Sequence, residues 1–473
     1  MQRRLLALAL SLLPFAAFPQ DARPPAAAAA LGAPDCKSTE LPAARYPRRL
    51  GALTDRERTM ARTAWKYFEN NTQSTGLANA VDNYPSTTMW DTGSYLGAIV
   101  AARELGVITA QQGDARLARA SDALNRLQFF RDDLPNKVYN TKTLEKADYA
   151  NRPGEIGYSA LDLGRLLVWL KIVKERYPQH ADAIDRFVLR WKWAHVVGTT
   201  GMMFGATVGK QGDVQYVQEG RLGYEEYAAK GFQLWGVSTE IASRPEPYAT
   251  VPIYCVEVPY DARDPRKFYQ HNYVVTESYA LDGIEFNWDL VTDRDTDDRR
   301  HSNAWMADFA NRVYQAQEDR WKGTRILTAR SGHQLDAGPY FVYDTVFTDG
   351  YAWNTITEAG QYTPQFAAVS LKAALGMWVL WQSPYTDRLF EEIARQADPA
   401  RGFMEGILEN GKGPIRAFTA NNNGIMLATL LFKQQGKLLK WGPPREGAWG
   451  RAQAPRGNGP APCTRAAASG APC

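Results

Sequence analysis

Carboxylates recur along this chain at the starts of segments with helical hydrophobic spacing, and most of them have an aromatic neighbour. The carboxylates that stand out are Asp91, Glu155, Asp162, Glu219, Glu285 and Asp349. The aromatic residues beside them include Trp90, Tyr158, Tyr224 and Trp353. Flat rings cover the apolar faces of sugars, while carboxylates and amides bond the sugar hydroxyls. The pattern therefore predicts a carbohydrate site.

Hydrolysis of a glycosidic bond would give these acids a role, because it needs one carboxyl group kept protonated and a second kept ionised. Each candidate also has a structural alternative. Asp91 could simply cap a helix. Asp162 lies inside an apolar helix, where Arg165 one turn later could be its ion-pair partner. Glu219 could compensate a helix dipole from the first turn. The sequence leaves these alternatives open.

The segment Glu219–Gly236 is predicted to be one helix, because its apolar residues follow the i, i+3, i+4, i+7 spacing of a single face. Gly220, Gly223 and Gly231 interrupt it, and each costs about 1 kcal/mol relative to Ala in a helix interior. A helix that carries three glycines is expected to bring bare backbone close to another helix or to a ligand.

Weak internal repetition favours outer and inner helices paired into a ring. The segment beginning Ala160-x-Asp162 resembles the one beginning Ala420-x-Asn422, and an apolar run follows each. Five such pairs have fair support, and a sixth would have to come from residues 244–290. We therefore predict a mainly all-α fold, an (α/α)6-type toroid of helical hairpins with short β-hairpin and loop insertions. The ring would gather the acids in one cleft, with Asn421 beside them.

Composition narrows the function classes. The 473 residues carry a formal net charge of +4, with 45% hydrophobic and 22% charged residues, which is ordinary for a globular protein. No basic stripe or nucleic-acid motif is visible, so no nucleic-acid partner is expected. The histidines are too scattered to predict a metal site, and no phosphate loop or other cofactor motif is present.

The chain is expected to be exported and to have one folded domain. Residues 1–20 have the basic start and short apolar run of a signal peptide, so we expect no stable membrane span after cleavage. Residues 21–50 form a Pro/Ala-rich linker, 51–440 a single toroid domain and 441–473 a flexible tail. Export of this Gram-negative type predicts a periplasmic or secreted protein, in which the four cysteines could oxidise.

Several motifs resemble those of the bacterial family called domain of unknown function 3131. They include Trp90-Asp91-Thr92-Gly93-Ser94, Gly154-Glu155-Ile156-Gly157-Tyr158 and Glu219-Gly220-Arg221-Leu222-Gly223-Tyr224. The chain is more distantly similar to glucoamylase-like and β-1,2-glucanase families, which are α/α toroids. Ser159-x-x-Asp162 and Glu219-x-Arg221-x-x-Tyr224 carry that resemblance, which implies a catalytic role for Glu219.

These observations together predict an exported carbohydrate-active protein of the six-hairpin glycosidase type. It would be a glycoside hydrolase or transglycosylase acting on a β-glucan or a surface polysaccharide, with Glu219 and Asp162 as its catalytic residues. The predicted substrate-binding residues are Trp90, Asp91, Glu155, Tyr158, Arg221, Tyr224, Glu285, Asp349, Trp353 and Asn421. The alternative is a glycan-binding or polysaccharide-export accessory protein without turnover. A polysaccharide lyase that uses His271 or Tyr273 as its base is less favoured than hydrolysis, since no basic patch for a uronate is visible.

Overall fold

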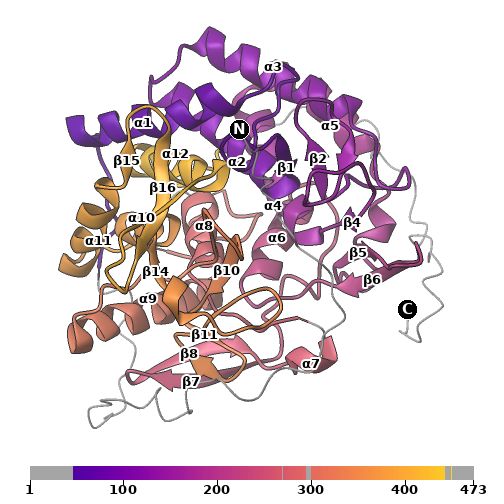
Figure 1. Ribbon diagram of the computed structural model, residues 1–473. Coiled ribbons are helices and arrows are strands. Elements are labelled where there is room, and N and C mark those ends of the chain that lie inside the picture. The colour runs from indigo at the N-terminus through magenta and orange to yellow at the C-terminus, as the bar shows by residue number, and fades with distance from the viewer. Residues whose placement is uncertain (1–45, 269, 295–299, 443–448, 450–473) are drawn as a thin grey trace, which may run out of the picture.

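The inner ring of the protein consists of six helices, as the computed structural model shows for residues 46–268, 270–294, 300–442 and 449 (Figure 1). Each helix of the ring packs against the next, and the last one, α12, closes the ring against α2. The ring consists, in order, of α2 (Met89–Glu104), α4 (Ala160–Arg176), α6 (Tyr224–Gln233), α8 (Glu277–Phe286), α10 (Leu371–Leu380) and α12 (Ala420–Gln435).

Five outer helices surround this ring, and each precedes an inner helix in the chain. They are α1 (Asp55–Asn71), α3 (Ala110–Arg126), α5 (Ala181–Leu189), α9 (Ala304–Thr324) and α11 (Pro384–Ala394). The described residues between α6 and α8 have no long outer helix. That segment instead forms a hairpin of β7 (Tyr248–Ile253) and β8 (Val256–Asp261), followed by the short helix α7 (Pro265–Phe268). The toroid is thus mainly helical, with a hairpin in place of the sixth outer helix.

Strands are more numerous than the sequence indicated, and they form small antiparallel sheets. One sheet joins β1 (Ser86–Thr88), β2 (Val138–Asn140) and β3 (Lys146–Ala147), and another joins β4 (Gly157–Tyr158), β5 (Phe204–Val208) and β6 (Val214–Gln218). A third joins β9 (His333–Gln334), β10 (Phe341–Asp344) and β13 (Thr355–Ile356), beside the pair β11 (Phe347–Thr348) and β12 (Tyr351–Ala352). The fourth joins β14 (Ala368–Ser370), β15 (Ala397–Asp398), β16 (Gly402–Leu408) and β17 (Pro414–Phe418).

These strands lead the chain directly into the inner helices. β1 ends where α2 begins, β4 ends just before α4, and β17 ends just before α12. At each of these junctions a hydroxyl residue is the helix N-cap: Thr88, Ser159 or Thr419. Its side chain accepts a hydrogen bond from the third helical residue, which satisfies one of the free N–H groups at the helix start. The N-terminal ends of α2, α4 and α12 therefore have the same capping arrangement.

Close contact between inner helices explains the glycines of the α6 region. A Cβ atom on Gly231 would lie 2.1 Å from the backbone oxygen of Gly164 in α4, and one on Gly164 would lie 2.5 Å from the backbone oxygen of Ala228. Since no real side chain tolerates such distances, α4 and α6 can approach this closely only with glycine at these positions. The expectation of bare backbone against another helix is confirmed for Gly231.

The predicted start of this helix is wrong. α6 begins at Tyr224, five residues after Glu219, and its N-cap is Gly223 with φ of 94°. A residue with this φ cannot lie inside a right-handed helix, so Gly223 ends the preceding loop. Glu219 therefore lies on the loop between β6 and α6, and its proposed interaction with the first turn of a continuous helix does not exist.

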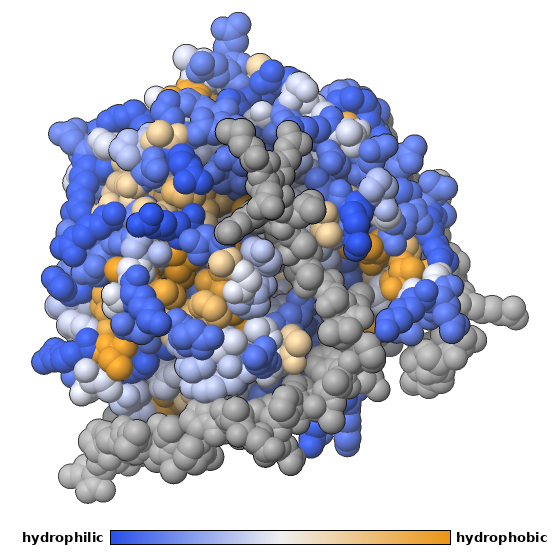
Figure 2. All heavy atoms as spheres, in the orientation of Figure 1, coloured by the Kyte–Doolittle hydropathy of each residue, from blue (hydrophilic) through white to orange (hydrophobic). Residues whose placement is uncertain are grey.

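The core fills the space between the two layers of helices. It is one large cluster in which tryptophans and tyrosines from both layers pack with aliphatic residues of the inner helices. The outer surface seen in Figure 2 is mostly hydrophilic, with smaller apolar areas between the elements. Within the described residues, no helix is both long enough and apolar enough to cross a membrane. Cys255, between β7 and β8, is disulfide-bonded. The predicted signal peptide and nearly all of the linker and tail lie outside the described residues.

Candidate functional site

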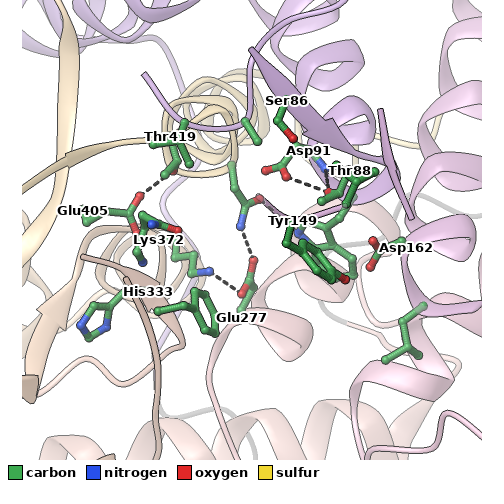
Figure 3. Close-up of a pocket in the computed structure, with 18 of the residues that line it drawn as sticks. Ser86, Thr88, Asp91, Tyr149, Asp162, Glu277, His333, Lys372, Glu405 and Thr419 are labelled. Carbon is green, nitrogen blue, oxygen red and sulfur yellow. Dashed lines mark hydrogen bonds and ion pairs between the residues drawn. The ribbon is translucent and has the colours of Figure 1, made fainter. Parts of the chain in front are cut away.

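A cavity of about 300 Å³ lies at the end of the ring where the inner helices begin (Figure 3). Inner-helix residues contribute Trp90, Asp91, Leu161, Asp162, Tyr224, Glu277, Lys372 and Asn421 to its wall. Strands and loops add, among others, Thr88, Tyr149, Tyr273, His333, Tyr343, Glu405 and Thr419. Residues from the first and the last helical pairs thus meet around one space, as the ring prediction requires.

On one side of the cavity, two aspartates occupy equivalent positions in neighbouring helices. Asp91 and Asp162 are each the third residue of their helix, and each is bonded to the hydroxyl of its N-cap. The Thr88 hydroxyl donates to Asp91 Oδ2 over 2.7 Å. The Ser159 Oγ lies 3.3 Å from Asp162 Oδ1. The cap motif therefore both starts the helix and turns a carboxyl group towards the cavity.

Glu219 lies behind Asp162 and contacts the same serine. Its Oε2 accepts a hydrogen bond from the Ser159 hydroxyl over 2.9 Å and one from the Leu161 backbone N–H over 3.3 Å. Burial raises the pKa of Asp162 to about 7, and the negative charges of Glu219 and Asp91 add to this shift. Asp162 is thus a carboxyl group that holds a proton close to neutral pH.

Arg165 is not the partner of Asp162. Its guanidinium donates to Glu285 over 3.1 Å and to the Tyr227 hydroxyl over 2.7 Å, deep in the core. Within the described part of the chain, no lysine or arginine forms an ion pair with Asp91 or Asp162. The alternative of a structural ion pair at Asp162 is therefore wrong, because the cation is committed elsewhere.

Glu277 lies at the start of α8 and is held by several donors. Lys372 Nζ is 2.7 Å from its Oε2, the Asn421 amide donates to its Oε1 over 2.7 Å, and the Tyr224 hydroxyl donates over 2.9 Å. Burial alone would raise the pKa of Glu277, but Lys372 and the Asn421 amide outweigh it and lower the pKa overall. Glu277 is therefore an ionised carboxylate in the same cavity as a protonated one.

Glu405 is a further carboxyl group in the wall of this cavity. It reaches the cavity from β16, where the Thr419 hydroxyl and the Gln334 backbone N–H donate to it. Burial raises its pKa to about 7, although Lys372 opposes the shift. Figure 3 shows Glu405, Lys372 and His333 on one side and Asp91 with Asp162 on the other. The cavity thus has carboxyl groups on opposite walls.

Aromatic rings form much of the remaining wall. Tyr273 and Tyr343 stack with centroids 4.5 Å apart, and Trp90 packs 5.6 Å from Tyr224. The indole N–H of Trp90 donates to Asn421 Oδ1, which fixes the amide so that its N–H group points to Glu277. The wall therefore offers flat rings beside fixed hydrogen-bonding groups, the combination that a sugar ring requires.

Glu285 does not line this cavity, and the expectation that it does is wrong. It lies eight residues after Glu277 in α8, about 12 Å further along the helix axis. Its oxygens accept from Arg165, Tyr227 and the Trp169 indole, and its side chain has no exposed surface. Glu285 is therefore part of a buried ion pair beneath the cavity.

Five other predicted substrate-binding residues, and the predicted catalytic residue Glu219, lie outside the wall of this cavity. Glu155 forms an ion pair with Lys146, and the hydroxyl of the buried Tyr158 donates to the His195 carbonyl. Asp349 occupies the turn between β11 and β12 and bonds to His271 over 2.9 Å. The two remaining residues, Trp353 and Arg221, make cation–π contacts, with Arg320 over Trp353 and Arg221 over Tyr273. Arg221 thus contacts a ring of the wall without being part of the wall, and the other four side chains interact with groups outside it.

Glu277, Glu405, Lys372 and Tyr149 are wall residues that the sequence analysis did not select. Glu277 and Glu405 stand near expected helix starts in the sequence, but nothing there distinguishes them from Glu285. A rule that accepts only acids in the first turn of an inner helix would have selected Glu277, because the rest of the helix leads away from this end of the ring. Tyr149 lies in a loop, where no periodic signal exists.

Comparison with known proteins identifies the family and the fold. The model of a family described as "Protein of unknown function (DUF3131)" matches residues 59–436. A search among curated proteins finds no match.

Solved structures with a similar fold include a Bacteroides caccae protein provisionally described as a glucoamylase, at 13% identity and a TM-score of 0.55, covering 81% of this chain and 94% of that one. An endo-β-1,2-glucanase from Chitinophaga pinensis, in complex with sophorotriose and glucose, has 13% identity and a TM-score of 0.56, with 82% and 94% coverage. At these identities the likeness shows a shared fold and assigns no reaction.

Proposed function

Because the chain belongs to the DUF3131 family, whose description names no activity, we propose its function from the cavity itself: a glycoside hydrolase or transglycosylase. The observation that carries this proposal is a pair of carboxyl groups in one aromatic-walled cavity with pKa values displaced in opposite directions. The pKa of Asp162 is raised to about 7, whereas that of Glu277 is lowered. Such a pair supplies an acid for the leaving sugar and an ionised group that can stabilise positive charge on the sugar ring.

Asp162 is the proton donor in this mechanism. It lines the cavity, and about half of it is protonated at pH 7 because burial and Glu219 raise its pKa to about 7. It would transfer its proton to the oxygen of the leaving sugar as the bond to the anomeric carbon breaks. Glu219 contributes by its charge and by fixing Ser159 and the start of α4.

Asp91 is the second reacting carboxyl group. The oxygens of Glu277 already accept from Lys372, Asn421 and Tyr224, so this carboxylate is a poor base but can stabilise positive charge that develops on the sugar ring. Asp91 bonds to the Thr88 hydroxyl and has no cation partner among the described residues. It is thus the better group to accept a proton from an attacking water or sugar hydroxyl.

The charge of the wall supports a substrate without acidic groups. Asp91, Asp162, Glu277 and Glu405 stand against one lysine, Lys372, which is already paired with Glu277. A uronate carboxylate would meet these acids without a free cation, so both a lyase and a hydrolase of acidic glycans are disfavoured. We propose a neutral β-glucan, the class to which the substrates named for the β-1,2-glucanases of similar fold belong.

Digestion of a glycan panel tests the proposal. Neutral β-linked glucans, including β-1,2-glucan, are incubated with wild type, Asp162→Asn and Asp91→Asn, and the released sugars are measured. Each variant should lose at least about 100-fold in kcat. The control variant is Asp213→Asn, which makes the same substitution at an exposed loop residue and should retain wild-type activity. Equal activity of Asp162→Asn and wild type would remove this acid from the mechanism, and binding without turnover in the wild type would instead favour the accessory protein.

We also propose that the protein acts outside the cytoplasm. The charged start and apolar run within residues 1–20 support export, and the disulfide at Cys255 suits an oxidising compartment. Cell fractionation of the full chain and of a chain lacking residues 1–20 tests this. The full chain should be found in the periplasm or medium, and the shortened chain should remain in the cytoplasm.

A further inference from the structure

Ser159 lies between the two carboxyl groups that the sequence marks as catalytic, and its hydroxyl has three polar neighbours. The Asp162 backbone N–H donates to Ser159 Oγ over 3.2 Å. Asp162 Oδ1 is 3.3 Å from the same oxygen, and Glu219 Oε2 is 2.9 Å from it. Two acidic side chains from α4 and from the loop before α6 therefore share one hydroxyl group.

The hydroxyl cannot satisfy both carboxylates. A serine has one proton to donate and two lone pairs to accept with, and the Asp162 N–H already occupies one lone pair. One proton and one lone pair remain for the two carboxyl oxygens. If both carboxyl groups were ionised, one of the two oxygen–oxygen contacts would contain no proton and would be repulsive. A carboxyl group that brings a proton of its own gives each of the two contacts a proton.

We propose that Ser159 is a proton relay that joins Asp162 and Glu219 into a unit holding one shared proton. In one form Asp162 Oδ1–H donates to Ser159 Oγ, whose own proton is donated to Glu219 Oε2. In the other form the Asp162 proton has moved to Ser159 while the serine proton has moved to Glu219. The serine is a neutral hydroxyl in both forms, and the single negative charge moves from Glu219 to Asp162.

The surroundings hold this geometry in place. A Cβ atom on Gly205 would lie 2.2 Å from Glu219 Oε1, so the strand β5 packs directly against that carboxyl group. Glu219 Oε2 also accepts from the Leu161 N–H, which ties the loop to the first turn of α4. The raised pKa of Asp162, caused first by burial and then by Glu219, agrees with a proton retained in this unit.

A relay would solve a problem of the proposed mechanism, on which this inference rests. Asp162 lines the cavity and gives up its proton there, so it must be reprotonated while sugar still fills that space. Glu219 lies on the other side of Ser159, outside the wall of the cavity, and is partly exposed. A proton taken up by Glu219 can pass through Ser159 to Asp162 without crossing the occupied cavity. Ser159 is thus a positioning residue whose hydroxyl carries the proton.

The test measures the carboxyl titration first, because this readout needs no substrate. Aspartate is labelled with carbon-13 at its side-chain carboxyl, and NMR follows the resonance that Asp162→Asn removes. In wild type this resonance should titrate with a midpoint near pH 7, since burial raises the pKa of Asp162 to about 7. Ser159→Gly should raise the midpoint by about one pH unit, since ionised Asp162 loses its hydroxyl donor. Ser159→Thr should restore the wild-type value.

The variants separate the relay from the capping role of Ser159. Glycine is tolerated at an N-cap, so Ser159→Gly should stay folded without the hydroxyl. Thr109→Ala removes the N-cap of the outer helix α3 and should leave the Asp162 midpoint unchanged. An identical midpoint in Ser159→Gly and wild type would overturn the relay, whether or not a substrate is known. If the midpoint shifts but no glycan is cleaved, the proposed function fails and the proton-sharing unit stands.

A kinetic readout applies once a substrate is found. Ser159→Gly should lower kcat about tenfold with little change in KM, because proton delivery and not sugar binding is impaired. In mixtures of light and heavy water, the rate of wild type should depend on deuterium content in a curved manner, as expected for more than one moving proton. Loss of that curvature in Ser159→Gly supports the relay, and a curve identical to that of wild type contradicts it.

Discussion

Asp162 and Glu277 face the same cavity, yet their surroundings displace their pKa values in opposite directions. The difference comes from partners and not from depth. Lys372 and Asn421 bond directly to Glu277, whereas the nearest charges to Asp162 are the negative ones of Glu219 and Asp91. The hydrogen-bond donors around each carboxyl group thus give the two groups different protonation states in one cavity.

The activity should fall as the pH rises through about 7. Asp162 must be protonated to act as the acid, and its pKa of about 7 sets where that proton is lost. A profile of kcat against pH on the substrate found by the glycan panel measures this limb. Lys137 lowers the pKa of Asp162, so Lys137→Met should move the limb to higher pH. If the fall in kcat occurs at the same pH in Lys137→Met and wild type, another group controls the loss of activity.

Asp162→Asn should stabilise the protein at pH 8 by about 1–3 kcal/mol, because a neutral amide avoids the cost of ionising a carboxyl group at this site. The folded pKa is raised above the unfolded value of 3.8, so the folded state binds the proton more tightly. That contribution to stability is full below pH 4 and is lost as the pH rises towards 7. Thermal unfolding of both proteins at pH 4 and pH 8 measures it, and an equal difference at the two pH values would contradict the linkage.

Three inner helices, α2, α4 and α12, begin with elements that set their position and their chemistry together. A strand leads into each helix, a hydroxyl residue caps it, and residues of its first turn line the cavity. This holds for Trp90 with Asp91 and for Leu161 with Asp162. In α12 the corresponding second residue is Asn421. The shared start therefore places side chains of these three helices in the cavity wall.

Gly231→Ala should lower the free energy of unfolding by about 3 kcal/mol, because the new Cβ atom would meet the backbone of α4 at 2.1 Å and force the two helices apart. The matched control is Gly323→Ala in the outer helix α9. Its Cβ atom would lie 3.5 Å from Tyr254, an ordinary contact, so this change should raise stability by up to about 1 kcal/mol. Denaturant unfolding compares them, and similar effects of both changes would show that the close approach of α4 and α6 is not required.

The sequence was sufficient to predict these elements where the signal is local. The segment expected to begin at Ala160 is the start of α4, and short β-hairpins such as β5–β6 are present as expected. The alternative that Asp91 caps its helix is wrong, because Thr88 is the N-cap and Asp91 is the third residue of α2. Local signals failed at α6, since apolar spacing continues through Gly223 although its φ of 94° stops the helix. Local signals also did not rank Glu277 above Glu285, although only the first turn of α8 reaches the cavity.

At the scale of the molecule, the ring brings together residues that are far apart in the chain. Asn421 bonds to Glu277, and Ser94 of α2 donates to the same asparagine. No pattern within a short stretch of sequence encodes such contacts, which exist because α12 packs on α2. The sequence could predict a ring and an acidic hollow. It could not predict that Lys372 and Glu405 form the wall opposite Asp162.

The disulfide at Cys255 should contribute to the stability of the whole protein. A reducing thiol should lower the unfolding temperature by several degrees, as expected when a cross-link of about 2–4 kcal/mol is lost. Cys255→Ser lacks the cross-link and should be insensitive to the thiol. Calorimetry with and without the reductant compares the two proteins. Equal sensitivity of both would mean that Cys255 does not form the stabilising bond.

The contact between the two ends of the ring also determines when the cavity can form during synthesis of the chain. The Gly51 backbone N–H donates to the Lys433 carbonyl over 2.8 Å, and Lys433 Nζ lies 2.9 Å from Glu57. One wall of the cavity comes early in the chain with Asp91, and another comes late with Asn421. A ribosome must therefore finish almost the entire polypeptide before any binding space exists. A nascent chain without α12 lacks Asn421 and with it part of the cavity wall.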